Sequence, residues 1–256
     1  MALASLADRL RAGETILSSW HAIPEPLIVE AVARAGFDAV VLDMQHGQFG
    51  PESLMRSIAA AALAGKPAVA RVAVGDFAMA SRALDMGAAG VIAPMVNSAA
   101  EASALVAAMK YPPLGARSWG PARAMTLARE RDEPAFLAAG NAASLAIAMI
   151  ETRAALEEVD SIIATPGIDG VFVGPWDLSV SLSGGKTVDP LLAGVDEALR
   201  QVARAAGAAG KVAATMVPNP ERARAAIDIG YRLIAVATDS DCLAAGARGI
   251  LAGCRL

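Results

Sequence analysis

The chain has 256 residues and 55% of them are hydrophobic, so it can bury a large core. Its 22 basic and 26 acidic residues nearly balance and no basic block stands out, which argues against nucleic acid as a partner. No apolar run approaches the roughly 18 residues that a membrane span needs, and residues 1–14 predict a short amphipathic helix rather than a signal peptide.

A repeating unit then runs along the chain: an apolar segment, polar residues, an alanine-rich helical segment and often a glycine. The apolar segments predicted as strands are 15–20, 39–42, 68–72, 90–96, 145–150, 170–173, 211–217 and 233–238. The predicted helices are 26–35, 51–64, 77–86, 98–110, 153–164, one within 189–207, 220–229 and 241–253. Because the strands are almost continuously apolar rather than alternating, we expect them to be parallel and buried on both faces.

Eight strand–helix units without a break in composition predict an α/β protein with a single (β/α)8 TIM barrel over residues 1–256, preceded by an N-terminal helix. A doubly wound open sheet is the alternative, but the first strand–helix turn has no GxGxxG motif for a dinucleotide. The long irregular stretch 111–124 carries Arg117, Trp119 and Arg123, which favours a functional loop.

Two acids lie just after consecutive predicted strands. Glu151 follows 145–150, and Asp177 comes soon after 170–173. The carboxyl ends of barrel strands share one face, so these side chains could hold one divalent cation, with water or substrate as the other ligands. The alternative is that each acid caps the helix after its strand.

Further polar residues are expected at the same end of the barrel. His46, three positions after Asp43, could be a general base oriented by that carboxylate, or it could bridge within its loop. Arg71 ends an apolar strand and needs an anionic partner, which could be substrate, Asp43 or Glu151.

Four more residues lie at or near the ends of predicted strands and helices. Trp20 and Trp176 could form apolar pocket walls, although tryptophan more often packs in a core. His21 is expected to be a solvated loop residue. Asp85 falls near a helix C-terminus, which is electrostatically unfavourable for an acid and hints at another use.

Six segments, in this order, resemble the HpcH/HpaI aldolase/citrate lyase family: VVLDMQHG, AVARV, LDMGAAGVIAPMVNSAAEA, YPPLGARSWGPARA, AMIETR and DGVFVGPWDLS. The closer resemblance is to the branch of metal-dependent (class II) pyruvate aldolases, which includes 4-hydroxy-2-oxoheptanedioate, 2-keto-3-deoxy-L-rhamnonate and 2-dehydro-3-deoxyglucarate aldolases. The resemblance extends over almost the whole chain.

The resemblance implies a role for each matching residue. Glu151 and Asp177 would bind the metal, Mg²⁺, Mn²⁺ or Co²⁺. His46 would be the catalytic base working with Asp43, and Arg71 would stabilise the enolate oxygen of pyruvate.

Further implied positions concern the neighbouring subunit and the substrate. Asp85 would reach the site of a neighbouring subunit. The remaining substrate-binding positions are Gly174, Pro175, Trp176, Trp20, Met216 and Val217. Three residues depart from the family pattern, namely Gln45 for a frequent Glu, Met149 for a Gln that contacts substrate in some members, and Trp176 for a frequent Ala. These departures bear on the aldehyde acceptor rather than on the chemistry.

The implied activity is that of a carbon–carbon lyase. It would reversibly cleave 4-hydroxy-2-oxo acids to pyruvate, or a related acid such as hydroxypyruvate, and an aldehyde. The residues also favour a metal over a Schiff base, because only Lys66 and Lys211 lie near strands, at their starting ends. The alternatives are a citryl- or malyl-CoA-type lyase, for which no basic patch for the CoA phosphates is apparent, and a catalytically silent barrel that acts as a binding module.

Relatives in the family are hexamers, so the resemblance also implies a homo-oligomer, a trimer of dimers whose C-terminal helix swaps between subunits. With only Cys242 and Cys254, the sequence predicts no disulfide framework. We therefore expect a reducing compartment, the cytoplasm, with small-molecule substrates and no membrane partner.

Overall fold

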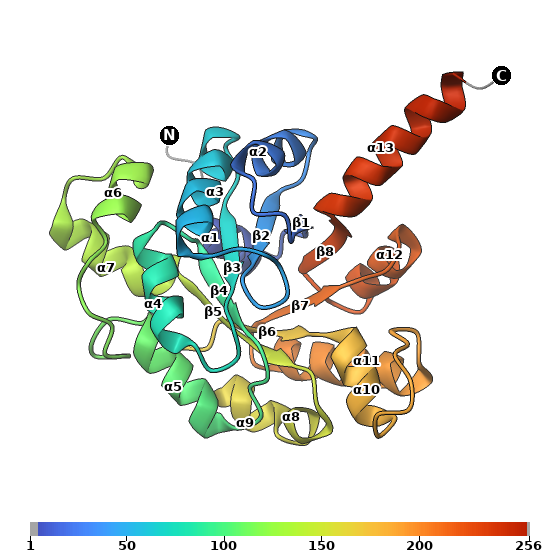
Figure 1. The fold of residues 1–256 in the computed structure, drawn as a ribbon. Helices are drawn as coiled ribbons and strands as arrows, with labels where there is room; N and C mark the ends of the chain where they lie inside the picture. Colours follow the sequence, from blue (N-terminus) through green and yellow to red (C-terminus); the bar gives the residue numbers. More distant parts are fainter. Residues whose placement is uncertain (1–4, 255–256) are drawn as a thin grey trace.

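A closed barrel forms the centre of the structure, a computed structural model that describes residues 5–254. Within these residues, eight parallel strands pair in chain order, and β8 pairs back with β1 (Figure 1). The strands are β1 (Ile16–His21), β2 (Ala39–Asp43), β3 (Ala68–Arg71), β4 (Gly90–Ala93), β5 (Leu145–Ile150), β6 (Gly170–Val173), β7 (Val212–Met216) and β8 (Leu233–Thr238). The predicted (β/α)8 barrel is therefore confirmed.

Helices surround the barrel and connect its strands. They are α1 (Leu6–Arg11), α2 (Pro26–Arg34), α3 (Pro51–Leu63), α4 (Phe77–Asp85), α5 (Ala99–Met109), α6 (Ala122–Ala128), α7 (Glu133–Ala143), α8 (Arg153–Glu157), α9 (Val159–Ala164), α10 (Pro175–Leu182), α11 (Ala193–Ala208), α12 (Pro220–Asp228) and α13 (Asp239–Cys254). The sequence patterns did not predict α6, α7 or α10, and the single helix expected over 153–164 is broken at Glu158 into α8 and α9. Among the described residues, no helix is long and apolar enough to cross a membrane.

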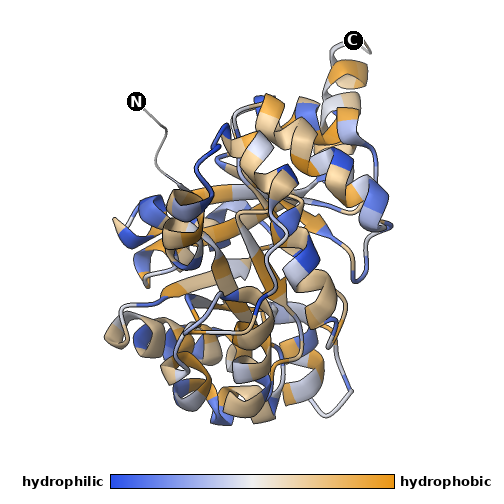
Figure 2. Ribbon diagram, turned by 90° about the vertical axis from the view of Figure 1, so that its left-hand side faces the viewer, coloured by the Kyte–Doolittle hydropathy of each residue, from blue (hydrophilic) through white to orange (hydrophobic). Residues whose placement is uncertain are grey.

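The apolar residues form two layers, one inside the barrel and one between the strands and the helices. The inner layer includes Val41, Val69, Ile92, Ile147 and Phe172, and the outer layer joins the opposite strand faces to the helices. In Figure 2 the strands are largely apolar in colour, and the hydrophilic residues lie mainly on the surrounding helices and loops. This burial on both faces is the reason for the continuous apolar segments in the sequence.

His21 was expected in a solvated loop, but the structure places it elsewhere. It is the last residue of β1 and is fully buried. Its Nε2 lies 2.9 Å from the Ser19 hydroxyl, and its Nδ1 lies 3.7 Å from an oxygen of the buried Asp239. That carboxylate also accepts hydrogen bonds from the backbone N–H groups of Ala22 and Ile23. The expectation was wrong because Asp239, at the start of α13, closes over β1 only in the folded chain.

Burial lowers the pKa of His21 to about 4, although the nearby charge of Asp239 favours the protonated form. The imidazole is therefore neutral in the folded protein near neutral pH, while the unfolded chain takes up a proton below about pH 6.5. Folded-state stability should consequently fall as the pH decreases from about 6.5 to 4, by up to about 3 kcal/mol from this group. Urea unfolding across this pH range should show that the free energy of unfolding falls less in His21→Gln than in the wild type. The same change at the exposed histidine, His46→Gln, is the control, and equal slopes in all three proteins would contradict the prediction.

Candidate active site

A cavity of about 170 Å³ lies at the carboxyl ends of the barrel strands. It brings together most of the residues that the sequence singled out, from β1, β3, β5 and β7, from the segments just after β2, β5 and β6, and from the start of α10. The lining residues are Trp20, His46, Arg71, Met149, Glu151, Phe172, Gly174, Pro175, Trp176, Asp177 and Met216. Of the predicted substrate-binding residues, Val217 is not among them, because its side chain packs in the outer core.

The two acids face this cavity and neither is a helix N-cap. Glu151 is buried directly after β5, and α8 is capped instead by Thr152, whose hydroxyl accepts the N–H of Ala155. Asp177 is exposed in the first turn of α10, which begins after Gly174. Gly174 also makes room for the pair, because a Cβ there would lie 2.5 Å from Oε1 of Glu151. The capping alternative is therefore wrong for both acids.

The environment of Glu151 suits a cation. Burial raises the pKa of Glu151 to about 7, and the nearby Asp177 carboxylate acts in the same direction. Two groups oppose this rise: the N–H of Met95, which lies 2.9 Å from Oε2 of Glu151, and the positive charge of Arg71. Two adjacent carboxylates with one of them buried are costly unless a positive charge compensates. Hard divalent cations prefer such oxygen ligands. Residues 5–254 contain no group of three or more His, Cys, Asp or Glu side chains placed for a metal. The carboxylates of Glu151 and Asp177, side by side in the cavity, are nevertheless of the chemical type that a divalent cation prefers.

Arg71 is held rigidly beside the acid pair. Its Nε and Nη2 donate to the two carboxylate oxygens of Asp43 at 2.8 and 2.6 Å, and its guanidinium lies 4.6 Å from the centre of the Trp20 ring. The indole N–H of Trp20 donates to the same carboxylate at 3.2 Å. Burial opposes ionisation of Asp43, but the hydrogen bonds and charge of Arg71 outweigh it and hold the pKa below its ordinary value. Asp43 is therefore the structural partner of Arg71.

Asp43 also shapes the loop that carries His46. Its Oδ1 accepts the backbone N–H groups of Gln45 and His46 at 2.9 and 3.3 Å. His46 is exposed at the cavity, so its imidazole can reach a bound ligand. Asp43 thus contacts the backbone of His46, and the hydrogen bonds of its carboxylate go to Arg71, Trp20 and the loop rather than to the imidazole.

Asp85 does not line this cavity. It ends α4, and its carboxylate accepts a hydrogen bond from Nη2 of Arg117 at 2.6 Å. Arg117 is buried against the ring of Tyr111, which in turn packs against Trp119. The long loop predicted over 111–124 is thus anchored by Asp85, on the side of the barrel where the strands begin.

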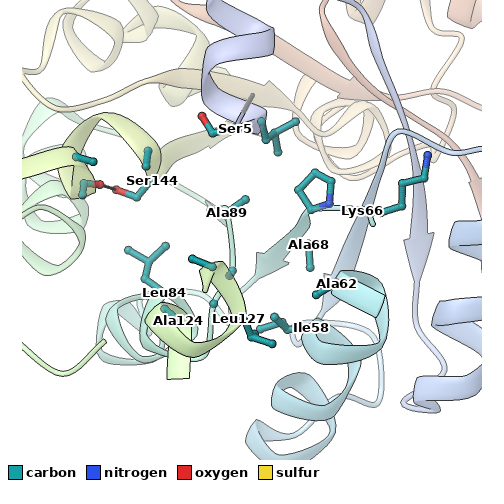
Figure 3. Close-up of a pocket in the computed structure, with 18 of the residues that line it drawn as sticks. Ser5, Ile58, Ala62, Lys66, Ala68, Leu84, Ala89, Ala124, Leu127 and Ser144 are labelled. Atoms are coloured by element: carbon teal, nitrogen blue, oxygen red, sulfur yellow. Dashed lines mark hydrogen bonds between the residues drawn. The ribbon is translucent and has the colours of Figure 1, made fainter. Parts of the chain in front are cut away.

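A second cavity of about 680 Å³ lies at that opposite, amino end of the barrel (Figure 3). Alanine and leucine side chains dominate its wall, as Figure 3 shows for Leu84, Leu127, Ala68 and Ala89. Lys66 belongs to this cavity and is not part of the lining of the 170 Å³ cavity. A lysine for Schiff-base chemistry is therefore missing from the described residues that line the cavity with the acid pair.

Residues 18–245 match the model of the family described as HpcH/HpaI aldolase/citrate lyase. The chain belongs to this family. The family is one of metal-dependent aldolases and implies a divalent metal, which agrees with the acid pair at the strand ends.

Individual members of the family are similar over nearly their whole length. A hydroxypyruvate/pyruvate aldolase of Rhizorhabdus wittichii is 38% identical over 243 residues, which cover 95% of each chain. A 4-hydroxy-2-oxo-heptane-1,7-dioate aldolase of Salmonella arizonae is 33% identical over 247 residues, which cover 96% of this chain and 92% of the relative. The crystal structure of an HpcH/HpaI aldolase from Desulfitobacterium hafniense superposes with a TM-score of 0.89 at 29% identity, covering 99% of this chain and 98% of that one.

Sequence reasoning missed the contribution of Met95 to the site. Its backbone N–H holds Glu151, and its φ of 56° is unusual for a residue with a side chain. The position of Met95, two residues after the end of β4, was the one available signal, because a backbone donor leaves no trace in the type of side chain.

Proposed function

We propose that the protein is a class II aldolase that reversibly cleaves 4-hydroxy-2-oxo acids to pyruvate, or a related 2-oxo acid such as hydroxypyruvate, and an aldehyde. The observation that carries this proposal is the pair of Glu151 and Asp177 beside Arg71 and His46 in one cavity at the strand ends. The names of the relatives, aldolases of these substrates, support it. The protein is accordingly a carbon–carbon lyase.

Glu151 and Asp177 would hold the divalent cation, which we propose to be Mg²⁺, Mn²⁺ or Co²⁺. When bound, such an ion supplies Lewis-acid stabilisation of the 2-oxo group. Arg71 adds a fixed positive charge for the enolate oxygen that develops as the bond between C3 and C4 breaks. Because Asp43 holds the guanidinium through two hydrogen bonds, this charge needs little reorganisation during the reaction.

His46 is proposed as the base. In cleavage it takes the proton of the 4-hydroxyl, the C3–C4 electron pair passes to the enolate, and the aldehyde carbonyl forms. In the reverse direction a base must remove a proton from the methyl group of pyruvate. An exposed imidazole at the edge of a partly buried cavity suits such proton transfer.

The cavity favours a small 2-oxo acid. Its volume of about 170 Å³ and its apolar wall of Trp20, Met149, Phe172 and Met216 suit a compact carbon skeleton. The backbone N–H of Trp176, in the first turn of α10, is proposed to bind the carboxylate, because a helix N-terminus stabilises an anion. We propose that the aldehyde part extends past Trp176 towards solvent.

Neither alternative has a specific observation in its favour. A CoA-dependent lyase needs several cations for the CoA phosphates, and Arg71 is the one arginine or lysine among the described residues that line this cavity. A silent binding module would not need the acids, Arg71 and His46 to be gathered in one place. Small molecules are therefore the proposed ligands, and the cytoplasmic location stays a prediction from the sequence.

Activity should require a divalent cation. Exhaustive chelation should abolish pyruvate release from a simple 4-hydroxy-2-oxo acid, manganese should restore it, and borohydride should trap no pyruvate adduct. Glu151→Gln and Asp177→Asn should each lose manganese binding in calorimetry while remaining folded, whereas Glu157→Gln, at an exposed acid on α8, is the matched control. Full activity after chelation would show that the chemistry does not depend on a metal.

Substitutions of His46 and of Arg71 should have different effects on ligand binding and on turnover. His46→Ala should bind manganese and pyruvate as the wild type does but lose about 10² to 10⁴ in kcat, the usual effect of a missing base. Arg71→Ala should weaken both pyruvate binding and turnover, since its charge acts on a substrate oxygen. Calorimetry with manganese and pyruvate, together with steady-state kinetics, separates the two. Loss of manganese binding in His46→Ala would instead make His46 a metal ligand.

We also propose that the chain assembles into a homo-oligomer, a hexamer built from dimers, in which α13 is exchanged. Strands β2 to β6 are buried over their whole length, but β1 has the exposed Leu17 and the last three residues of β8 are half-buried. The helix that should cover this seam, α13, extends away from the barrel in Figure 1. Only its first residue, Asp239, is buried.

The exposed apolar residues of α13 support the same proposal. Leu243, Ile250 and Leu251 are 49%, 71% and 50% exposed, and their spacing of seven and eight residues puts them on one face of the helix. The α13 of a second copy could cover the seam between β1 and β8 with this face.

Ile250→Asp combined with Leu251→Asp should therefore dissociate the assembly, because each charge would be buried at the interface. Val188→Asp is the matched control at an exposed apolar residue outside α13. Size-exclusion chromatography with light scattering measures the mass. A monomeric wild-type protein, or an unchanged mass in the double variant, would contradict the proposal.

A further inference from the structure

A strained residue lies directly beside the acid pair. Met95 has a φ of 56°, in the left-handed region that is costly for residues with a side chain. In this conformation its N–H donates to Oε2 of Glu151 at 2.9 Å. Arg129, the other described residue with a side chain and a positive φ, merely ends α6. The strain at Met95 has a local use, because it aims a backbone donor at a buried carboxylate.

Asn97 holds Met95 in this conformation. The Nδ2 of Asn97 donates to the carbonyl oxygen of Met95 at 2.8 Å, and its Oδ1 accepts the hydroxyl of Thr152. The orientation of the amide follows from Thr152, whose oxygen already accepts the N–H of Ala155 at 3.0 Å. The single hydroxyl hydrogen of Thr152 is then available for Oδ1, so the NH₂ group must face the Met95 carbonyl.

The backbone of Asn97 is itself anchored. Its N–H donates to the carboxylate of Glu101, and the next residue, Ser98, caps α5 by accepting the N–H of Glu101 at 3.2 Å. From this fixed point the side chain of Asn97 reaches two segments at once: the loop after β4, through Met95, and the loop after β5, through Thr152. Asn97 thus contacts Thr152, the residue directly after Glu151, and Met95, the residue whose N–H binds the Glu151 carboxylate.

We propose that Asn97 is a positioning residue for the metal site. It keeps Met95 in the left-handed conformation, so that the Met95 N–H holds Oε2 of Glu151 and Oε1 is directed towards Gly174 at the cavity wall. Asn97 does not line the cavity and acts only through Met95 and Thr152. The inference rests on the proposed role of Glu151 as a metal ligand. Removing a group that orients a metal ligand in this way typically costs about 10- to 100-fold in metal affinity.

The test is a calorimetric titration with manganese alone, in the absence of substrate. Asn97→Ala should bind manganese at least about 10-fold more weakly than the wild type. Ser98→Ala is the matched control: it removes the cap of α5 one residue away and should lower the melting temperature without changing manganese affinity. Asn97→Ser serves in place of Asn97→Ala if the alanine variant does not fold, because serine is too short to span both loops.

A second arm tests the link to backbone strain. Glycine adopts positive φ without strain, so Met95→Gly should make the conformation independent of Asn97. The loss of manganese affinity caused by Asn97→Ala should then be roughly fivefold smaller in the Met95→Gly background than in the wild type. An equal loss in both backgrounds would overturn the proposed coupling.

The outcomes also separate this inference from the proposed function. If the wild-type protein does not bind manganese, the role of Glu151 as a ligand is wrong, and the proposed function and this inference fail together. If the wild type binds manganese and Asn97→Ala binds it equally well, only the role of Asn97 is overturned.

Discussion

The bidentate ion pair between Arg71 and Asp43 is the interaction on which the arrangement of the site depends. It joins the ends of β2 and β3, and the Trp20 indole, which donates to the same carboxylate, adds the end of β1. The remaining acceptor capacity of Asp43 goes to the backbone of the loop that carries His46. One buried carboxylate therefore places a fixed positive charge, an apolar wall and the start of a polar loop relative to one another. A lone buried arginine or aspartate would be costly, so each partner depends on the other.

The two ends of the barrel differ in how their buried charges are compensated. At the carboxyl ends, Glu151 is buried with a raised pKa beside a second acid, an arrangement that only a bound cation or proton makes favourable. At the amino ends, charges are paired within the chain, as in the buried Lys110, whose Nζ lies 2.7 Å from Asp169, and in Asp85 with Arg117. Paired charges stabilise a fold, while an uncompensated acid pair provides a place for a ligand. The described residues that line the larger cavity at the amino end are mainly apolar and include a single acid, Glu14, rather than a pair.

The helix that follows β8 gives the barrel an incomplete outer layer. Parallel sheets need cover on both faces, yet α13 leaves the barrel at Asp239 and the seam between β1 and β8 retains exposed and half-buried residues. Asp239 is the residue at which α13 leaves the barrel. Its carboxylate accepts the backbone N–H groups of Ala22 and Ile23, directly after β1, and lies 3.7 Å from Nδ1 of the buried His21. The exposed apolar residues of α13 and the incomplete burial of Leu17 and of the last residues of β8 support the proposed exchange of α13 between two copies.

The sequence by itself determined the barrel and most of the residues that line its cavity. Continuous apolar segments alternating with amphipathic ones specify the strand–helix units, and parallel strands bring Glu151, Arg71, Trp20 and His46 to one end whatever the packing details. The burial of His21, the pairing of Asp85 with Arg117, and the departure of α13 were decided only by the tertiary structure. Each depends on a partner far along the chain or on the direction of an element, which local periodicity does not encode. The left-handed backbone of Met95 belongs to the same group, because the Asn97 side chain that contacts it is itself bound by Thr152 of another loop, which the barrel brings close only when it closes.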